Sequence, residues 1–204
     1  LATSWTEIWD SKASDFIQYA DQIVASRTSA TGGIRWKEGD TSATVISTMP
    51  KLEGLELYRE RMFGFGPSNT ATETALYWSD IITTDAPTGV YNWNADSIIY
   101  VGRGNGQYIT GLVAEYNSIT IFKHASTYSF TYIALPEEGT MTLIQQGIGA
   151  ENRECIAAYQ NGYIVLHDRT LYKFQNNQYA PINAQQVRFE AVGEEETYAK
   201  NQCV

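Results

Sequence analysis

A motif that recurs four times limits the fold of this 204-residue chain more than any other feature of its sequence. Each copy begins with a tyrosine, followed by two or more polar or turn-forming residues and then by an apolar run. The four tyrosines are Tyr19, Tyr58, Tyr116 and Tyr159, at intervals of 39, 58 and 43 residues. Repeats at such intervals are typical of a fold built from similar structural units in a row.

The residues that follow each tyrosine repeat as well. After Phe122 the turn KHAS leads into a second aromatic segment around Tyr128, and after Val165 the turn HDR leads into residues 170–174. Longer loops lead into comparable segments at 33–36 and 75–78. The common pattern is strand, tight turn, strand, loop, strand. Tyrosine is abundant, with 14 copies against 7 Phe and 5 Trp, and this composition favours strands.

Four antiparallel strands of about five residues, with their turns, need about 40 residues, which is the length of one β-propeller blade. We therefore expect an all-β fold, a β-propeller with about four to five blades in this chain, as a whole propeller or as part of a larger one. Residues 1–190 are expected to form the blades. Residues 191–204 contain three consecutive glutamates and are expected to form an acidic extended tail.

Several local signals bear on this expectation. The long middle interval is explained by loops at 66–74 and 85–94, and insertions of this kind lie at blade faces. Asn161-Gly162 lies between two apolar segments and predicts a two-residue hairpin turn. Residues 13–25 have the apolar spacing of an amphipathic helix, but their alignment with the other three copies favours two strands.

The charge balance excludes one class of function. The chain has 14 basic and 23 acidic residues, for a net charge of -9, so it lacks the cationic surface on which tight nucleic-acid binding depends. No apolar stretch approaches the roughly 18 residues of a membrane helix. The first ten residues lack the basic and apolar regions of a secretion signal, although the chain begins with Leu1, which is compatible with processing.

The cysteines and histidines do not suggest a metal site. Cys155 lies in an apolar run and is expected to be a buried thiol, whereas Cys203 is expected to be exposed near the end of the chain. Neither has a neighbour at the spacing that zinc requires. His124 and His167 each follow an apolar run and precede a polar turn, so we expect turn or strand-edge positions. The sequence predicts no metal and no cofactor.

Two segments invite a catalytic interpretation. GRGNG at 102–106 follows a strand-like run, but a dinucleotide-binding loop opens a helix, and the next residues, QYITGLVAEY, form a strand pattern. A turn is therefore predicted. Residues 29–36 match the Ser, Gly and Trp positions of the sialidase hairpin motif S-x-D-x-G-x-T-W, yet Thr31 replaces its Asp and Arg35 replaces its Thr.

Other signs of catalysis are weak. The carboxylates of Asp80 and Asp85 cannot be assigned the separation that a glycosidase needs. Nucleophile-elbow, H-E-x-x-H and Walker motifs are missing from the sequence. We therefore expect a protein that is not an enzyme. Trp78, Tyr91 and Trp93 are candidates for an exposed aromatic surface that stacks on sugars, with packing between blades as the favoured alternative.

The order of motifs over residues 57–130 resembles a known family. The segments are LYRERMFGFG, ALYWSD, VYNW and YITGLVAEYNSITIFKHASTYSF, followed by the turn Gly147-Ile148-Gly149. In this order they resemble the β-propeller of tailed-bacteriophage tail proteins, the tail nozzle or tail tubular hub class. The resemblance covers about residues 50–175. Members of this class are usually much longer, so the chain would be a short relative or a fragment.

The resemblance implies an architectural function. The chain would be a structural virion protein of the phage tail, assembled in the host bacterial cytoplasm as a ring homo-oligomer with adjacent tail or adaptor proteins. DNA would pass through an acidic lumen without specific binding, and no membrane partner is expected. The alternatives are a glycan- or protein-binding propeller, such as a receptor-binding module, and, less favoured, a sialidase-like glycoside hydrolase.

Overall fold

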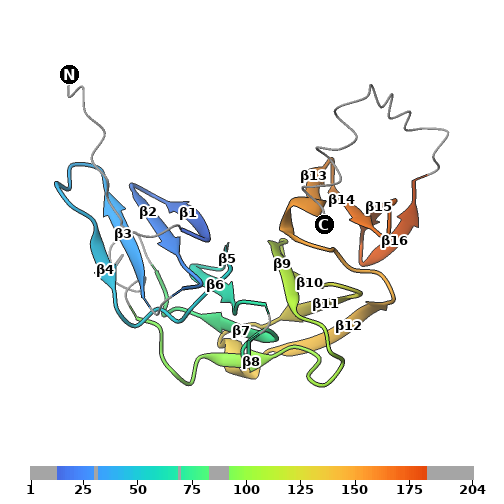
Figure 1. Ribbon diagram of the computed structural model, residues 1–204, viewed down its shortest axis with the longest axis horizontal. Helices are drawn as coiled ribbons and strands as arrows, with labels where there is room; N and C mark the ends of the chain where they lie inside the picture. Colours follow the sequence, from blue (N-terminus) through green and yellow to red (C-terminus); the bar gives the residue numbers. More distant parts are fainter. Residues whose placement is uncertain (1–12, 30–31, 69, 83–91, 183–204) are drawn as a thin grey trace. The chain divides into compact units, whose positions relative to one another are not determined.

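A computed structural model describes residues 13–29, 32–68, 70–82 and 92–182 (Figure 1). Within these ranges the strands form four four-stranded antiparallel sheets, and the only helical elements are two short 3₁₀ turns, η2 (Pro136–Glu138) and η3 (Arg153–Cys155). The expectation of an all-β chain is confirmed. The predicted tail at 191–204 lies outside the described residues.

The chain divides into two compact units, Leu1–Arg103 and Gly104–Val204. The first unit contains two sheets. Their strands are β1 (Asp15–Tyr19), β2 (Gln22–Ser26), β3 (Gly33–Lys37) and β4 (Thr44–Ile46), then β5 (Gly54–Tyr58), β6 (Arg61–Phe65), β7 (Ala75–Trp78) and β8 (Ile98–Tyr100).

The second unit contains the third and fourth sheets. Their strands are β9 (Ile109–Ala114), β10 (Ile119–Lys123), β11 (Ser126–Thr131) and β12 (Thr140–Gln146), then β13 (Ile156–Tyr159), β14 (Gly162–His167), β15 (Thr170–Gln175) and β16 (Gln178–Pro181). No helix of the described segments is both long enough and apolar enough to cross a membrane.

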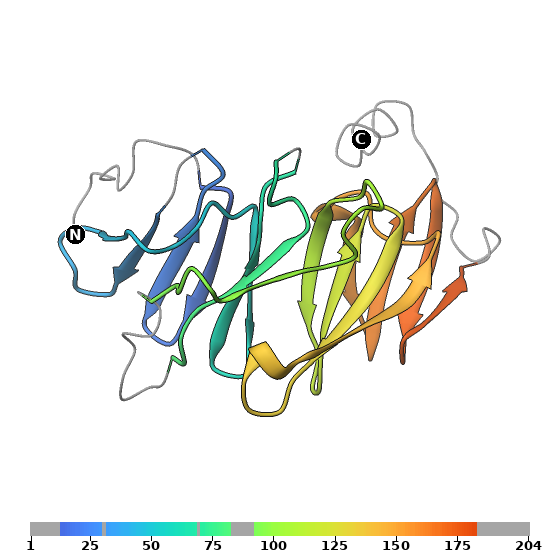
Figure 2. The ribbon, with the colours of Figure 1, turned by 90° about the horizontal axis from the view of Figure 1, so that it is seen from below.

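Every sheet is a simple meander, because the order of strands across it follows the order of strands along the chain (Figure 2). This is the topology of a propeller blade. The tyrosine repeat now has a structural meaning: Tyr19, Tyr58 and Tyr159 are the last residues of β1, β5 and β13, the first strands of their sheets, and Tyr116 lies just after β9. Residues 13–25, for which a helix was the alternative, form β1 and most of β2.

The glycine-rich segment 102–106 is a turn, as predicted. It connects β8 to β9, and Gly102, Gly104 and Gly106 have φ angles of +53°, +85° and +68°. Glycine adopts this left-handed backbone without steric cost. A strand follows the segment, so it lacks the helix N-terminus that binds a pyrophosphate.

The Asn161-Gly162 turn prediction was wrong by one residue. The loop between β13 and β14 is Gln160-Asn161, and Gly162 already pairs with Tyr159 as the first residue of β14. A Cβ atom on Gly162 would lie 2.3 Å from the carbonyl oxygen of Phe174 on β15. Glycine is therefore required here by the close approach of the next strand and not by the turn.

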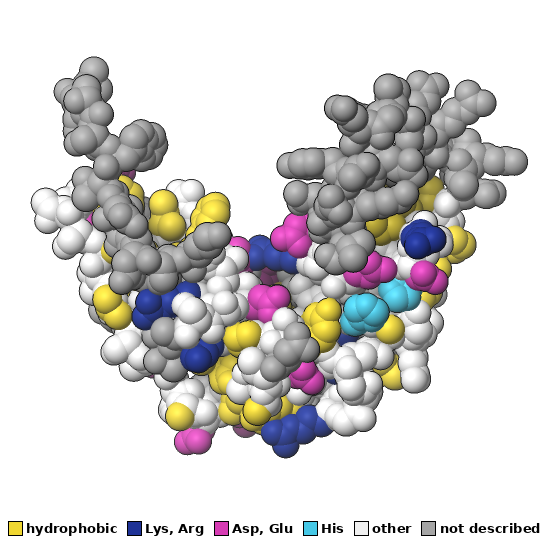
Figure 3. All heavy atoms as spheres, viewed as in Figure 1, with side chains coloured by type: hydrophobic (Ala, Val, Ile, Leu, Met, Phe, Trp, Pro, Cys, Tyr) yellow, Lys and Arg dark blue, Asp and Glu magenta, His cyan; other side chains and the backbone are white. Residues whose placement is uncertain are grey.

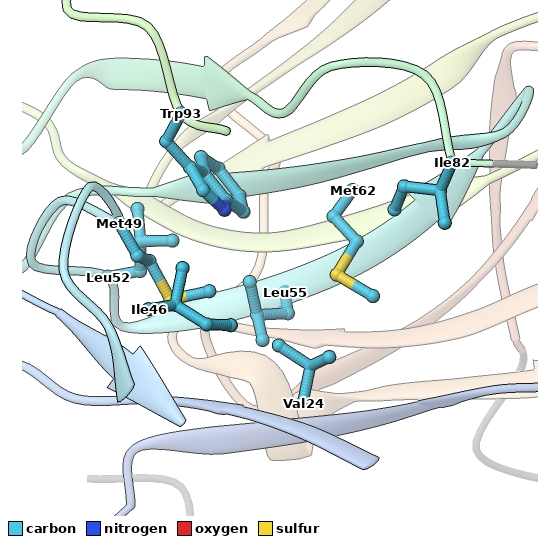
Figure 4. Packing of buried hydrophobic residues seen from close by; sticks show 8 residues of the cluster. All are labelled: Val24, Ile46, Met49, Leu52, Leu55, Met62, Ile82 and Trp93. Atoms are coloured by element: carbon cyan, nitrogen blue, oxygen red, sulfur yellow. The ribbon is translucent and has the colours of Figure 1, made fainter. Parts of the chain in front are cut away.

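The core of the first unit lies between its two sheets (Figure 4). Val24 and Ile46 of the first sheet meet Leu55 and Met62 of the second, and the cluster is completed by side chains from the connecting segments: Met49, Leu52, Ile82 and Trp93. Fully burying such a side chain stabilises the fold by about 1.5–3 kcal/mol. The backbone N–H of Leu55 also donates to the Asp15 carboxylate at 2.7 Å, which joins β5 to β1.

The core of the second unit lies between the third and fourth sheets. Phe122 of β10 packs edge-on against Phe174 of β15, with ring centroids 5.8 Å apart, and Val165 and Ala150 complete the buried cluster. The Tyr179 hydroxyl is 2.6 Å from the Thr127 hydroxyl. Burial is the larger influence on Tyr179 and raises the pKa of its phenol.

Candidate binding pocket

The second unit has a pocket of about 410 Å³ at the tips of three hairpins. This volume is within the range of small-molecule sites. The turn after β9, the turn between β13 and β14 and the turn between β15 and β16 form it. The residues that line it are Glu115, Tyr116, Ala158, Gln160, Asn161, Gly162, Tyr163, Phe174, Gln175, Asn176 and Asn177.

Turn geometry explains why amide side chains gather there. Asn176 and Asn177 have φ angles of +53° and +59°, and Gln160 has +51°. Asparagine is enriched at such left-handed positions because its short polar side chain stabilises them locally. The residues that allow the tight turns therefore also place carboxamides at the mouth of the pocket.

The pocket combines these carboxamides with aromatic rings and one carboxylate. Each carboxamide offers two N–H donors and an accepting oxygen. Tyr116 is 93% exposed, whereas Phe174 is buried and belongs to the core below. Glu115 accepts a 2.9 Å hydrogen bond from the Thr120 hydroxyl. This arrangement can bind a neutral ligand that carries several hydroxyl groups and an apolar face.

The structure places the predicted aromatic surface residues elsewhere. Trp78 is 2% exposed and packs near Phe63, with ring centroids 6.3 Å apart, and Trp93 is 5% exposed within the first unit's core (Figure 4). Their large apolar areas favour burial over exposure, so these two tryptophans form no exposed surface and agree with packing, the alternative that the sequence favoured. Tyr91 lies outside the described residues.

The other residues singled out in the sequence do not converge on this pocket. His124 lies in the exposed turn after β10, and His167 ends β14, as expected from their turn-edge pattern. Cys155 is a buried thiol that forms no disulfide, and Cys203 lies outside the described residues. Within the described ranges, no group of three His, Cys, Asp or Glu side chains could hold a metal ion. Asp85 and Thr31 lie outside the described residues.

Sequence reasoning did not identify the pocket residues as a site. Its signals were the Asn-Gly pair, interpreted only as a turn, and Tyr116, interpreted only as a repeat marker. The sequence does not show how the sheets pack on one another. This packing brings the tips of three hairpins together from positions up to about sixty residues apart.

No family model and no curated protein matches the chain. Among solved structures, a functionally unknown protein from Desulfotomaculum acetoxidans DSM 771 has a TM-score of 0.54 at 10% identity, over 83% of this chain and 54% of that chain. Kluyvelomyces marxianus Hsv2 has a TM-score of 0.50 at 10% identity, over 84% of this chain and 48% of that chain. The likeness shows a propeller-like fold. The chain spans about half the length of these two proteins.

Proposed function

We propose that the chain is a non-catalytic binding module of a β-propeller and that the hairpin-tip pocket binds a carbohydrate. The observation that carries this proposal is the pocket itself, in which carboxamides from two turns lie beside the exposed ring of Tyr116. Carboxamides can both donate to and accept from sugar hydroxyls. A tyrosine ring offers a flat apolar surface for the C–H face of a pyranose.

The affinity expected for such a site is low. Net hydrogen-bond contributions of about 0.5–1.5 kcal/mol each, added to one aromatic contact, leave only a small surplus over the entropy lost on binding. A dissociation constant on the order of 1 mM for a monosaccharide corresponds to about -4 kcal/mol. Longer glycans that cross the hairpin tips should bind more tightly.

The test is a titration of the ¹⁵N-labelled protein with a panel of neutral and acidic oligosaccharides, followed by NMR. At least one sugar should shift the amides of residues 115–116, 160–161 and 176–177. Tyr116→Ala should weaken binding roughly 2–10-fold, the value of one aromatic contact of about 0.5–1.5 kcal/mol. Tyr108→Ala is the matched control, because Tyr108 lies just before β9 and the pocket lies just after it. Equal loss in both variants, or no shift with any sugar, would refute the proposal.

A second proposal follows from the resemblance in residues 50–175: the chain is a structural protein of a phage tail, in a ring around the DNA exit channel. The meander blades and the net charge of -9 support it. On the face in Figure 3, acidic and basic side chains of the described residues are interspersed and form no continuous basic patch. A surface of this kind would let DNA pass without gripping its phosphates.

This second proposal predicts multi-subunit rings without DNA affinity. Negative-stain images of the purified protein at high concentration should show closed rings wider than one propeller. Addition of the protein should not change the gel mobility of duplex DNA at low salt, where binding to phosphates is strongest. Particles no larger than one propeller, or a DNA shift that salt abolishes, would contradict it.

A further inference from the structure

The first sheet has one apolar side that faces away from the second sheet. The strand register places seven residues on it, and none of them is charged. We call this side the first-sheet outer face; it consists of Phe16, Gln18, Ile23, Ala25, Ile34, Trp36 and Val45. Phe16 is 70% exposed and Val45 is 62% exposed. The opposite side of the same sheet carries Val24 and Ile46, which pack against the second sheet.

The fourth sheet has a comparable side. Its register places mainly apolar residues opposite the side that packs on the third sheet, with Lys173 as the one charge among them. We call this side the last-sheet outer face; it consists of Ala157, Tyr159, Gly162, Ile164, Leu166, Leu171, Lys173, Gln175, Gln178 and Ala180. Tyr159 is 46% exposed. The packed side carries Ile156, Val165 and Phe174.

The internal repeat shows what should cover the last-sheet outer face. Tyr159 ends β13 as Tyr19 ends β1. Tyr19 lies on the side of the first sheet that faces the second sheet: its ring packs against the core cluster, and its hydroxyl donates to the Ile82 carbonyl at 2.9 Å. The last-sheet outer face is therefore the side that a following sheet covers.

The same comparison applies to the first-sheet outer face. Phe16 lies three residues before the tyrosine that ends its strand, as Leu55 and Ile156 do in β5 and β13. Leu55 is buried in the cluster against the first sheet, and Ile156 packs in the cluster between the third and fourth sheets. Both counterparts are thus covered by the preceding sheet. The first-sheet outer face is the side that a preceding sheet covers.

We propose that the last-sheet outer face of one copy packs on the first-sheet outer face of a second copy, and that two such contacts join the copies head to tail as a dimer. The two faces are opposite halves of one kind of interface, and a head-to-tail contact that repeats by rotation closes a ring. Lys173 is the single charge across both faces, so no like charges oppose each other. The propeller-like chains of D. acetoxidans and K. marxianus are about twice as long as the part that matches this chain, so each contains further chain beyond four such sheets. This inference rests on the blade architecture and not on carbohydrate binding.

The oligomeric state of the full chain tests this inference. Native mass spectrometry and sedimentation should show a species of twice the 22.8 kDa chain mass at micromolar concentration. Phe16→Glu and Tyr159→Glu each place a charge at both contacts of the dimer, and each should raise the dimer dissociation constant at least 100-fold. Both side chains are exposed, so circular dichroism of these variants should match that of the parent. Ile133→Glu, at a side chain that is 96% exposed and outside both faces, should leave the dimer intact.

A mixture of the two variants separates head-to-tail pairing from any symmetric contact. The last-sheet outer face of Phe16→Glu and the first-sheet outer face of Tyr159→Glu are both intact, so the mixture should form a heterodimer that neither variant forms alone. A parent that stays monomeric at all concentrations would overturn the inference, because the two outer faces would then not bind each other. So would a dimer that both variants leave unchanged, or a mixture that forms no heterodimer.

Discussion

Phe122→Ala should lower the free energy of unfolding of the second unit by about 3–5 kcal/mol. Phe122 is completely buried between the third and fourth sheets, and its ring meets Phe174 edge-on at 5.8 Å. Truncation removes the aromatic contact and leaves a cavity that the two sheets can close only by moving together. A loss of this size is a large fraction of the total stability of a small domain.

Urea denaturation followed by far-ultraviolet circular dichroism measures this loss as a lower midpoint. Tyr116→Ala is the control: it removes a ring of similar size from a side chain that is 93% exposed, and it should change stability by less than about 0.5 kcal/mol. Equal midpoints for the two variants would show that the third and fourth sheets do not pack through Phe122.

Gly149→Ala should destabilise the second unit by about 3 kcal/mol or more, because it forces atoms into the backbone of a neighbouring hairpin. A Cβ at this position would lie 1.9 Å from the Lys123 carbonyl oxygen and 2.8 Å from the Ser126 amide nitrogen. Neither atom can move aside without opening the turn between β10 and β11. The Ala150 amide also donates to the Lys123 carbonyl at 3.0 Å, and this bond would be lost with the turn.

Gly147→Ala provides the matched comparison two residues earlier. A Cβ there meets no atom within 4 Å, but the residue has a φ of +87°. Its cost is conformational and should be about 1–2 kcal/mol. Thermal unfolding should therefore rank the parent above Gly147→Ala and Gly147→Ala above Gly149→Ala. The reverse order would mean that the backbone conformation, and not the contact with β10, is what requires these glycines.

The repeat unit could be predicted from the sequence because its signals are local. Strand, turn and strand lie within about twenty residues of each tyrosine, and the apolar alternation around Tyr19 or Tyr159 depends only on neighbouring positions. The choice of strands over a helix at 13–25 was right for the same reason: the comparison with three other copies outweighed a spacing that suits either structure.

What depended on the packing of sheets could not be predicted. Packing was the favoured interpretation for Trp78 and Trp93, but the residues that bury them depend on the register of β7 and on the course of the connecting segment. Gly162 was assigned to a turn because the atom that leaves no room for a Cβ there, the carbonyl oxygen of Phe174, lies on another strand. The pocket needed three hairpin tips brought together, and no single segment carries that information.

The meander order of every sheet has a consequence for how the chain reaches its native state. Each strand pairs with its sequence neighbour, so the loops that must close are short and the contact order within a blade is low. Hairpins of this kind form in microseconds. Blades should therefore form early and independently of one another. The slow events should be the docking of blade against blade and, for the terminal faces, the encounter of two chains, which should give refolding a phase whose rate rises with protein concentration.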